Sequence, residues 1–422
     1  MGIKDFQKNL KANYEKAYSN NYLSSYDHVL VDLNYVLHYC SYSVKCEDDI
    51  YEKIYKFFDD ILGFLTPTKT VVITTDGVAP LAKIVLQRQR RLTIKKTSKE
   101  SSFNSIIFTY GTKFMNSLYG KLKEYFEFIE KSYCINVIFL DNKFDEAELK
   151  LTKYIIDTLK INNDDSFIYV TNDSDVLLML TAIDNPFNLF IYSKQQLSSS
   201  NDILSVGKLL DLHTTKYGMT KNYNNDFTFI NIMLGNDYIP KINLVDFDKL
   251  WDAYKFITII NKIGIIDNNK INIEFLYKLM MKIFVGLKQF LRKKYGYNSL
   301  RKNIYSNYFD GLLWCFDMYK NGICSRYNFM YFSKENPNPF GIIFNIDRYK
   351  NTKMFLLNTS TYLPINHNLY PLLVLPKSEK HLISKDYNDF VDIIDEHKLY
   401  EKPIISLQEI NTIISLFNQK FK

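Results

Sequence analysis

The sequence contains few Gly and Pro residues, which interrupt helices and strands, and few Cys residues, which form disulfides. Only 14 Gly and 10 Pro occur among its 422 residues, which excludes a collagen-like or Pro/Gly-rich disordered chain. The five Cys are odd in number and form no CxxC pair and no Cys/His metal spacing. We therefore expect a protein of a reducing compartment, without a disulfide framework or a structural zinc site.

Long apolar runs are also absent. No segment approaches the roughly 20 apolar residues that a helix needs to cross a bilayer. The start, MGIKDFQKNL, carries charges where a signal peptide has an apolar core. We expect a soluble intracellular protein with no membrane partner. We place it in the cytoplasm, although RQRRLTIKK (88–96) would also fit a nuclear import signal.

Aromatic residues, by contrast, are abundant, with 33 Tyr and 31 Phe. Together with the many Asn, Lys and Ile residues they indicate an AT-rich genome, such as that of a virus. They are therefore weak evidence for base-stacking surfaces. The net charge of +7 suits a polyanionic partner, but it also suits an ordinary cytosolic protein.

The first half of the chain alternates short apolar runs with helix-length amphipathic segments. Amphipathic helices are expected, for example, at 48–65 and 120–133. Five near-continuous apolar runs are typical of strands buried on both faces: 28–33, 70–75, 135–140, 166–171 and 188–193. This alternation predicts an α/β fold with a mostly parallel central sheet flanked by helices.

The pattern changes after about residue 245. A long amphipathic helix with a basic end is expected at 273–294, and beyond residue 300 the chain is rich in Asn, Tyr and Pro. We predict two parts. Residues 1–300 form the core, and residues 301–422 form an α-rich region that packs onto it.

Acidic residues follow three of the predicted strands: Asp32, Asp76, Asp173 and Asp175. In an open parallel sheet the carboxyl ends of the strands form the crevice where ligands bind. A single Asp at such a place is equally well explained as a turn former or helix N-cap. Several carboxylates that converge there repel one another unless cations lie between them.

Three more acids follow, Glu146 and Glu148 in DEAELK and Asp237 in LGNDYIP. A Glu pair in a first helical turn is favourable without any metal, and GND is compatible with a plain turn. Oxygen ligands without His or Cys indicate Mg²⁺ or Mn²⁺. Two such ions can activate a water and stabilise the leaving oxygen of a phosphodiester. The acids together therefore predict a nuclease.

A cationic helix face follows Asp76, in TTDGVAPLAKIVLQRQRR (74–91). At about 100° per residue, four polar side chains fall within an arc of roughly 100°, opposite the apolar residues: Lys83, Gln87, Arg90 and Arg91. A solvated basic face is the ordinary explanation of such a run. Its position directly after a strand-end acid instead favours a pocket for a terminal phosphate, because charge-assisted hydrogen bonds are worth about 1.5–3 kcal/mol each.

In the same order along the chain, these segments resemble the motifs of the XRN 5′→3′ exoribonuclease family, within the flap-endonuclease-like and PIN-like nucleases. DGVAPLAK…QRQRR resembles the family's DGVAPRAK…QRSRR, LVDLNYVLH its LDMNxxLH, and TYGTKFM its TPGTxFM. EAE, NDSD and GNDYIP stand at its ExE, DAD and GNDFLP. The resemblance covers nearly the whole chain and implies a PIN/flap-endonuclease-like fold.

The resemblance also implies roles for individual residues. It implies substrate contacts from Asn34, and stacking of His38 against the first base. It implies a 5′-monophosphate pocket formed by Lys83, Gln87, Arg90 and Arg91. It implies two Mg²⁺ or Mn²⁺ ions held by seven catalytic acids: Asp32, Asp76, Glu146, Glu148, Asp173, Asp175 and Asp237.

The C-terminal segments 308–325 and 369–383 resemble, more weakly, the family's second conserved region. That resemblance implies that residues 301–422 enclose the active site and restrict it to single strands. Where the family has SWxWYYPYHYAP, this chain has SRYNFMYF (325–332), without Trp. Tyr327 or Phe329 is therefore expected to stack opposite His38.

The resulting hypothesis is a monomeric, metal-dependent, processive 5′→3′ exoribonuclease. It degrades single-stranded RNA with a 5′-monophosphate to nucleotide monophosphates, in mRNA decay. A structure-specific 5′ flap or DNA nuclease would share the acids, although no helix-hairpin-helix signal follows Gly235. A catalytically inactive RNA-binding scaffold is the alternative of another class, and the presence of all seven acids counts against it.

Overall fold

The computed structural model describes most of the chain. The end of the helix expected at 273–294 and the end of the segment 88–96 lie outside the described residues. The described residues are 6–42, 44, 46–94, 104–194, 202–259, 264–267, 270–285, 302–333, 335–349, 361–400, 402 and 405–421.

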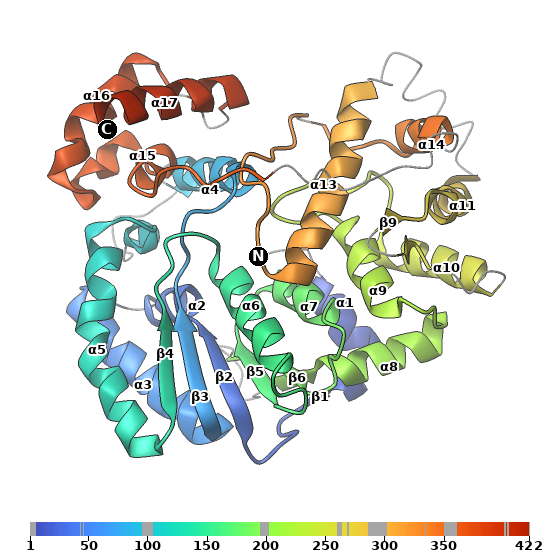
Figure 1. The fold of residues 1–422 in the computed structure, drawn as a ribbon, viewed down its shortest axis with the longest axis horizontal. Helices are drawn as coiled ribbons and strands as arrows, with labels where there is room; N and C mark the ends of the chain where they lie inside the picture. Colours follow the sequence, from blue (N-terminus) through green and yellow to red (C-terminus); the bar gives the residue numbers. More distant parts are fainter. Residues whose placement is uncertain are drawn as a thin grey trace.

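A seven-stranded sheet forms the centre of the molecule, with the strand order β1-β7-β6-β5-β2-β3-β4 (Figure 1). Strands β2 to β6 run parallel, whereas β1 and β7 add antiparallel at one edge. The predicted mostly parallel sheet is confirmed, and each predicted strand overlaps one of β2 to β6. The bounds are β1 Tyr18–Ser19, β2 Tyr26–Asp32, β3 Pro67–Thr74, β4 Asn136–Leu140, β5 Phe167–Val170, β6 Leu189–Ser193 and β7 Asp202–Ser205.

The central strands end at nearly the same level. Asp32, the last residue of β2, pairs with Thr74, the last residue of β3. On the other side of β2, strand β5 ends at Val170, level with the residue before Asp32. Asp76 and Asp173 follow shortly after β3 and β5. The register therefore brings these three acids to one edge of the sheet.

Helices cover both faces of the sheet. One face forms an apolar core with α2 (Leu33–Cys40), α3 (Asp48–Leu65) and α5 (Lys113–Tyr133). The helices expected at 48–65 and 120–133 correspond to α3 and to the second part of α5. The other face packs against a larger helical layer: α1 Phe6–Asn13, α6 Ala147–Leu159, α7 Ser174–Thr181, α8 Val206–Tyr217, α9 Tyr223–Ile232, α10 Phe247–Thr258, α11 Ile273–Phe284, α13 Lys302–Asn321 and α14 Pro339–Tyr349.

Helix α13, the first described helix beyond residue 300, belongs to this larger layer. It contacts α6, α7 and α9, and Trp314 in its middle is fully buried. The C-terminal region thus packs onto the core, as predicted. The boundary between residues 300 and 301 stays a prediction. In the described part of the chain, no helix combines the length and apolar character needed to span a bilayer.

The last part of the chain packs onto α4 (Leu81–Ile94), at the upper left of Figure 1. The apolar side chains of α4, such as Leu81 and Ile84, share a separate core with the C-terminal helices. This core therefore covers the α4 face opposite the predicted cationic one. The elements of this region are α15 Tyr370–Val374, η6 Lys377–Leu382, η7 Lys385–Tyr387, α16 Asn388–Glu396 and α17 Leu407–Lys420.

Arg88 ties α4 to this C-terminal core. Its side chain is fully buried, and its guanidinium donates to three backbone carbonyls. The Nη1–O distance to Leu373 is 2.6 Å and the Nε–O distance to Lys402 is 3.1 Å; Nη2 donates to Leu399. Burial lowers the pKa of Arg88 to about 10, so the group stays charged at neutral pH. Its role is to hold the C-terminal segment against α4.

Replacing Arg88 should loosen this contact. Arg88→Met keeps an apolar stem but leaves three carbonyls without their donor, and each unsatisfied buried group costs about 1–3 kcal/mol. We expect the free energy of unfolding to fall by about 3 kcal/mol or more, with faster amide exchange around residues 399–402. Glu396→Gln, at an exposed position of α16, is the matched control. Equal stability of the two variants would contradict a stabilising role for Arg88.

Candidate active site

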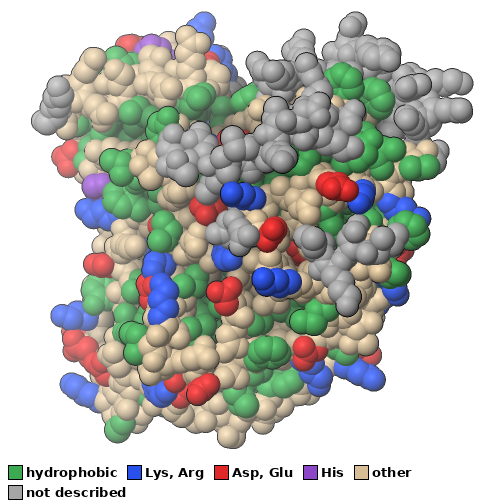
Figure 2. All heavy atoms as spheres, turned by 45° about the vertical axis from the view of Figure 1, so that its right-hand side comes forward, with side chains coloured by type: hydrophobic (Ala, Val, Ile, Leu, Met, Phe, Trp, Pro, Cys, Tyr) green, Lys and Arg blue, Asp and Glu red, His purple; other side chains and the backbone are tan. Residues whose placement is uncertain are grey.

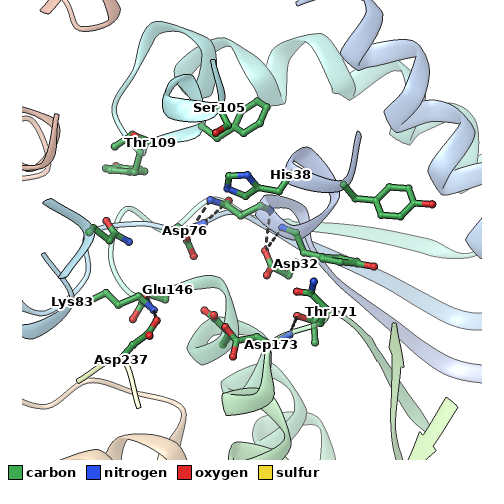
Figure 3. Close-up of a pocket in the computed structure, with 18 of the residues that line it drawn as sticks. Asp32, His38, Asp76, Lys83, Ser105, Thr109, Glu146, Thr171, Asp173 and Asp237 are labelled. Carbon is green, nitrogen blue, oxygen red and sulfur yellow. Dashed lines mark hydrogen bonds and ion pairs between the residues drawn. The ribbon is translucent and has the colours of Figure 1, made fainter. Parts of the chain in front are cut away.

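The carboxyl edge of the sheet opens into a cavity of about 730 Å³. Its walls come from the strand ends, α4, η2 (Ser105–Phe108), α6 and α15. In Figure 3 the labelled acids lie around one space, and His38 lies above Asp32 and Asp76. Of the thirteen predicted site residues, Asp175 alone does not line the cavity. The twelve that do are Asp32, Asn34, His38, Asp76, Lys83, Gln87, Arg90, Arg91, Glu146, Glu148, Asp173 and Asp237.

Asp32 is both the end of a strand and the cap of a helix. Its Oδ1 accepts hydrogen bonds from the backbone N–H groups of Asn34 (2.9 Å) and Tyr35 (3.2 Å) and so begins α2. Burial, together with the negative charges of Asp76 and Asp173, raises the pKa of Asp32 well above its ordinary value. A cation in the cavity would therefore stabilise its ionised form.

Asp76 joins β3 to the start of α6. One carboxylate oxygen accepts from the backbone N–H of Ala147 at 3.0 Å, and the other accepts from Asn34 Nδ2 at 3.0 Å. The Asn34 Oδ1 in turn accepts the Asp76 N–H at 3.1 Å. Asn34 therefore acts here as a brace for Asp76.

Two glycines let the chain turn beside these acids. A Cβ on Gly77 would lie 2.6 Å from the carbonyl oxygen of Lys143, which excludes any side chain there. Gly235 has φ +85°, and its Cβ would lie 2.5 Å from the backbone nitrogen of Lys241. The DG and GND motifs therefore depend on their glycines to place Asp76 and Asp237.

Glu146 and Glu148 enter the cavity from the first turn of α6. Glu146 is buried and accepts from the hydroxyl of Tyr238. The Glu148 Oε2 is buried and has no hydrogen-bond partner among the described residues. Burial and the charge of Glu146 raise the pKa of Glu148 well above its ordinary value. A cation beside this oxygen would stabilise the ionised carboxylate.

Asp173 and Asp175 flank the start of α7. The Asp173 Oδ1 accepts from the backbone N–H of Asp175 at 2.9 Å and so caps the helix. Asp175 is 4% exposed, and its Oδ1 has no hydrogen-bond partner among the described residues. Burial, Asp173 and Asp237 raise the pKa of Asp175 well above its ordinary value. Asp175 thus forms a second layer behind the cavity wall.

Two cationic residues of the predicted phosphate pocket pair with the acids instead of standing apart from them. The Lys83 Nζ lies 2.7 Å from Glu146 Oε1 and 2.9 Å from Asp237 Oδ2. The Arg90 Nη2 lies 2.8 Å from Asp237 Oδ1. Although burial opposes it, these two cations lower the pKa of Asp237 below its ordinary value. Lys83 and Arg90 thus supply positive charge to one side of the acidic cluster.

The acids fit a hard divalent cation by their chemistry. The donors are carboxylate oxygens without His or Cys, which suits Mg²⁺ or Mn²⁺ better than zinc. The Glu148 Oε2 and the Asp175 Oδ1 have no hydrogen-bond partner among the described residues, which favours a cation near them. In the described part of the chain, however, no three His, Cys, Asp or Glu side chains already stand close enough to hold one ion. Ion binding would therefore require these side chains to draw together.

Gln87 and Arg91 form the other side of the predicted phosphate pocket. Both line the cavity, and the hydroxyl of Tyr370 donates to Gln87 Oε1. The Arg91 Nε is buried and has no hydrogen-bond partner among the described residues. A buried cationic donor without an acceptor favours an anion at this position.

The first part of the chain is similar to a known protein family. Residues 1–191 match the family model described as XRN 5′-3′ exonuclease N-terminus. This part of the chain is similar to the XRN exonucleases. The resemblance expected from the motifs is confirmed over this part of the chain.

Two curated relatives and one solved structure are examples of proteins with some similarity to this chain. Human 5′-3′ exoribonuclease 1 is 26% identical over 148 residues, covering 29% of this chain and 9% of that protein. The 5′-3′ exoribonuclease 2 of Candida albicans is 33% identical over 93 residues, covering 21% of this chain and 9% of that protein. The catalytic core of Rad2 in complex with DNA substrate is 13% identical, with a TM-score of 0.41, covering 94% of this chain and 99% of that one. The matches to the curated relatives thus span about a tenth of their length.

The XRN motif that lacks its Trp here does not place its aromatics in the cavity. Tyr327 is 7% exposed and donates to Asp145, and Phe329 stacks on Trp314 with ring centroids 4.4 Å apart. Neither side chain lines the cavity. The expectation that one of them stacks opposite His38 is wrong for this structure, because the Tyr327 hydroxyl binds Asp145 and the Phe329 ring packs on Trp314 of α13.

His38 itself lies on the cavity wall, as the XRN resemblance implies. Its side chain is exposed, and its ring meets Phe108 edge-on, with centroids 5.3 Å apart. Enclosure within the site and the charge of Arg91 lower the pKa of His38. The imidazole is therefore neutral at neutral pH and presents a flat uncharged ring.

Three residues near the site were not expected from the XRN motifs. Tyr370 lines the cavity, and Tyr238 binds Glu146. The Lys150 Nζ, behind the acids, donates to the carbonyls of Thr75 (2.8 Å) and Asn142 (2.6 Å). Burial lowers the pKa of Lys150 to about 8. Its place between Leu149 and Leu151 is a signal that could have pointed to this buried group.

Proposed function

We propose that this chain is a divalent-metal-dependent 5′→3′ exoribonuclease that removes nucleotides from single-stranded RNA with a 5′-monophosphate. The observation that supports this most strongly is the sharing of one cavity. Acids from five separate segments and the cationic face of α4 line the same space of about 730 Å³. Such a space suits the end of a nucleic acid strand with its scissile phosphate beside the acids and its terminal phosphate beside α4.

The proposed hydrolytic centre consists of the seven acids. They would hold two Mg²⁺ or Mn²⁺ ions, which when bound lower the pKa of a water and stabilise the leaving oxygen. Asp32, Asp76 and Asp173 lie at the strand ends, and Glu146, Glu148 and Asp237 line the same cavity. Asp175 would complete the set from behind, through the charge that it adds next to Asp173 and Asp237.

The proposed terminal-phosphate pocket consists of Gln87, Arg90, Arg91 and Lys83. Arg91 supports it most directly, because its buried Nε has no partner in the described part of the chain. Charge-assisted hydrogen bonds to phosphate are worth about 1.5–3 kcal/mol each. After each cleavage the new 5′-phosphate would enter the same pocket, which gives a physical reason for stepwise, processive release of nucleotide monophosphates.

The face shown in Figure 2 does not add to this proposal. On it, cationic and acidic side chains of described residues are interspersed, without a broad field of one sign. The proposed recognition of the substrate is therefore argued from the cavity. The cytoplasmic location, the monomeric state and a role in mRNA decay stay predictions.

The proposal is tested by matched oligonucleotides. With Mg²⁺, we expect 5′-phosphorylated single-stranded RNA to be degraded at least about a hundredfold faster than 5′-hydroxyl RNA, and chelation to abolish cleavage. The factor corresponds to about 2.7 kcal/mol of phosphate contacts. Preferential cleavage of a 5′ flap on duplex DNA would instead support the flap nuclease. Tight RNA binding without any cleavage would support the inactive scaffold.

A further inference from the structure

Gln87 and Tyr370 meet at the wall of the cavity. Tyr370 is the first residue of α15 and is 1% exposed. Its hydroxyl donates to the side-chain Oε1 of Gln87, and both residues line the cavity together with Arg91. The contact joins residues 283 positions apart in the sequence.

The orientation of a glutamine amide decides how it meets an anion. One side of the group is a carbonyl oxygen, which only accepts hydrogen bonds, and the other is an NH₂, which only donates. A phosphate is repelled by the first and bound by the second. Because the Tyr370 hydroxyl already donates to the carbonyl oxygen, the NH₂ is the part of Gln87 left for the cavity.

The phenol is well suited to remain the donor. Burial and the nearby charge of Asp76 raise the pKa of Tyr370 above its ordinary value, so the hydroxyl keeps its proton at neutral pH. A protonated phenol beside a carbonyl oxygen has one favourable arrangement, with the O–H directed at that oxygen.

Helix α4 also fixes the position of Tyr370. Arg88, the neighbour of Gln87, donates from Nη1 to the carbonyl of Leu373 in the same short helix α15, at 2.6 Å. The ring of Tyr370 meets that of Tyr110, with centroids 6.0 Å apart. The two adjacent side chains of α4 thus hold α15 at two points, which restricts where the hydroxyl can lie.

We infer that Tyr370 is a positioning residue for 5′-phosphate recognition, because its hydroxyl holds Gln87 with the side-chain Nε2 donor directed toward the terminal phosphate. This inference rests on the proposed function and adds the residue that sets the polarity of the pocket. Tyr370 acts through Gln87 and takes no part in bond cleavage.

Tyr370→Phe removes the hydroxyl and keeps the buried ring. We expect the preference for 5′-phosphorylated over 5′-hydroxyl RNA, measured as a ratio of kcat/KM values, to fall about tenfold, the factor for one lost hydrogen bond of about 1.4 kcal/mol. The loss should appear in KM for the phosphorylated RNA, because the contact serves binding. Tyr400→Phe is the matched control. Its hydroxyl donates to Leu372 O at 3.4 Å in the same region, without lining the cavity.

A double-mutant cycle separates positioning from general damage. Gln87→Leu should reduce the phosphate preference by itself, and adding Tyr370→Phe should then change it no further, since the hydroxyl acts only through the amide. Additive losses would overturn the inference. So would a Tyr370→Phe variant with the full preference, or an equal loss in Tyr400→Phe.

The wild-type protein separates this inference from the function on which it rests. Binding of short 5′-phosphorylated and 5′-hydroxyl RNAs, measured by calorimetry in EDTA, gives the preference without turnover. A wild-type chain without any preference would overturn the proposed phosphate pocket itself. A clear wild-type preference that Tyr370→Phe retains would overturn only the role of Tyr370.

Discussion

Asp173→Asn combined with Asp175→Asn is expected to lower RNA turnover by at least about a thousandfold, or about 4 kcal/mol of transition-state stabilisation. The pair supplies two carboxylates to the acidic cluster, and one of them has a buried oxygen without a partner among the described residues. Asn retains the capping hydrogen bond to the start of α7, because it is as good an N-cap as Asp. The fold should therefore survive, and RNA with a 5′-phosphate should still bind.

The same variant should change stability in a direction opposite to its effect on activity. In the unfolded chain the carboxyl of Asp175 titrates near pH 4, whereas burial and neighbouring acids raise its pKa in the folded chain. The contribution of this group is therefore fully present below about pH 4 and is lost as the pH rises through the folded pKa. In EDTA at neutral pH, the double variant should have a higher Tm than the wild type.

An acid outside the cluster provides the control. Asp184→Asn changes an exposed position after α7 and should leave both turnover and Tm unchanged. In the wild type, Mg²⁺ should raise the Tm, and the double variant should lose most of this gain. Wild-type turnover in the double variant would remove both acids from the mechanism.

Arg91→Met is expected to weaken the selection of the 5′-phosphate by between about tenfold and about a hundredfold. The basis is the loss of a buried cationic donor, worth about 1.5–3 kcal/mol when it binds a phosphate. Met retains much of the apolar stem, so packing beside Tyr370 should change little. The measurement is the ratio of kcat/KM values for RNAs that differ only in the 5′-phosphate.

The control for Arg91 must remove the same charge elsewhere. Lys56→Met does so at an exposed position of α3 and should leave the ratio unchanged. If Arg91 acts only through its general positive charge, both variants should lose a similar part of kcat/KM for both RNAs. The ratio of kcat/KM values for the two RNAs would then not change. Arg91 would then have no place in the pocket.

The strands of the sheet were predictable because burial on both faces leaves a run of apolar residues. HVLVDL became β2 and SFIYVT became β5, each within two residues of the predicted bounds. The two antiparallel strands at one side of the sheet, β1 at the edge and β7 next to it, were not predicted, whereas β4 at the other edge was. β1 has two residues, and β7 begins with the polar Asp202. A short edge strand is stabilised by its neighbour rather than by its own apolar pattern, so the sequence carries little local signal for it.

The acids at the site were predictable from their places at strand ends, but their partners were not. Lys83 was expected beside a phosphate, yet it pairs with Glu146 and Asp237. Helical spacing placed it on the correct face of α4 without saying which group on that face it would meet. Arg88 lies about 140° around the helix from Lys83, so the same spacing already separated it from the cationic face.

The role of Tyr370 could not be predicted from the local sequence pattern. In LYPLLVLP it looks like one more core residue, and its ring is indeed buried. Its contact with Gln87 depends on the packing of α15 against α4, which joins segments nearly 300 residues apart. Such a contact becomes visible only when the tertiary arrangement is known.

The C-terminal core on α4 limits how far the chain can be shortened. A truncation after residue 191, the end of the family match, would strip the cover from Leu81 and Ile84 and leave Arg88 without its carbonyl acceptors. The resulting fragment would expose the apolar face of α4 to solvent and should aggregate on expression. An excised catalytic piece must therefore keep the chain through Phe417, whose ring closes this core.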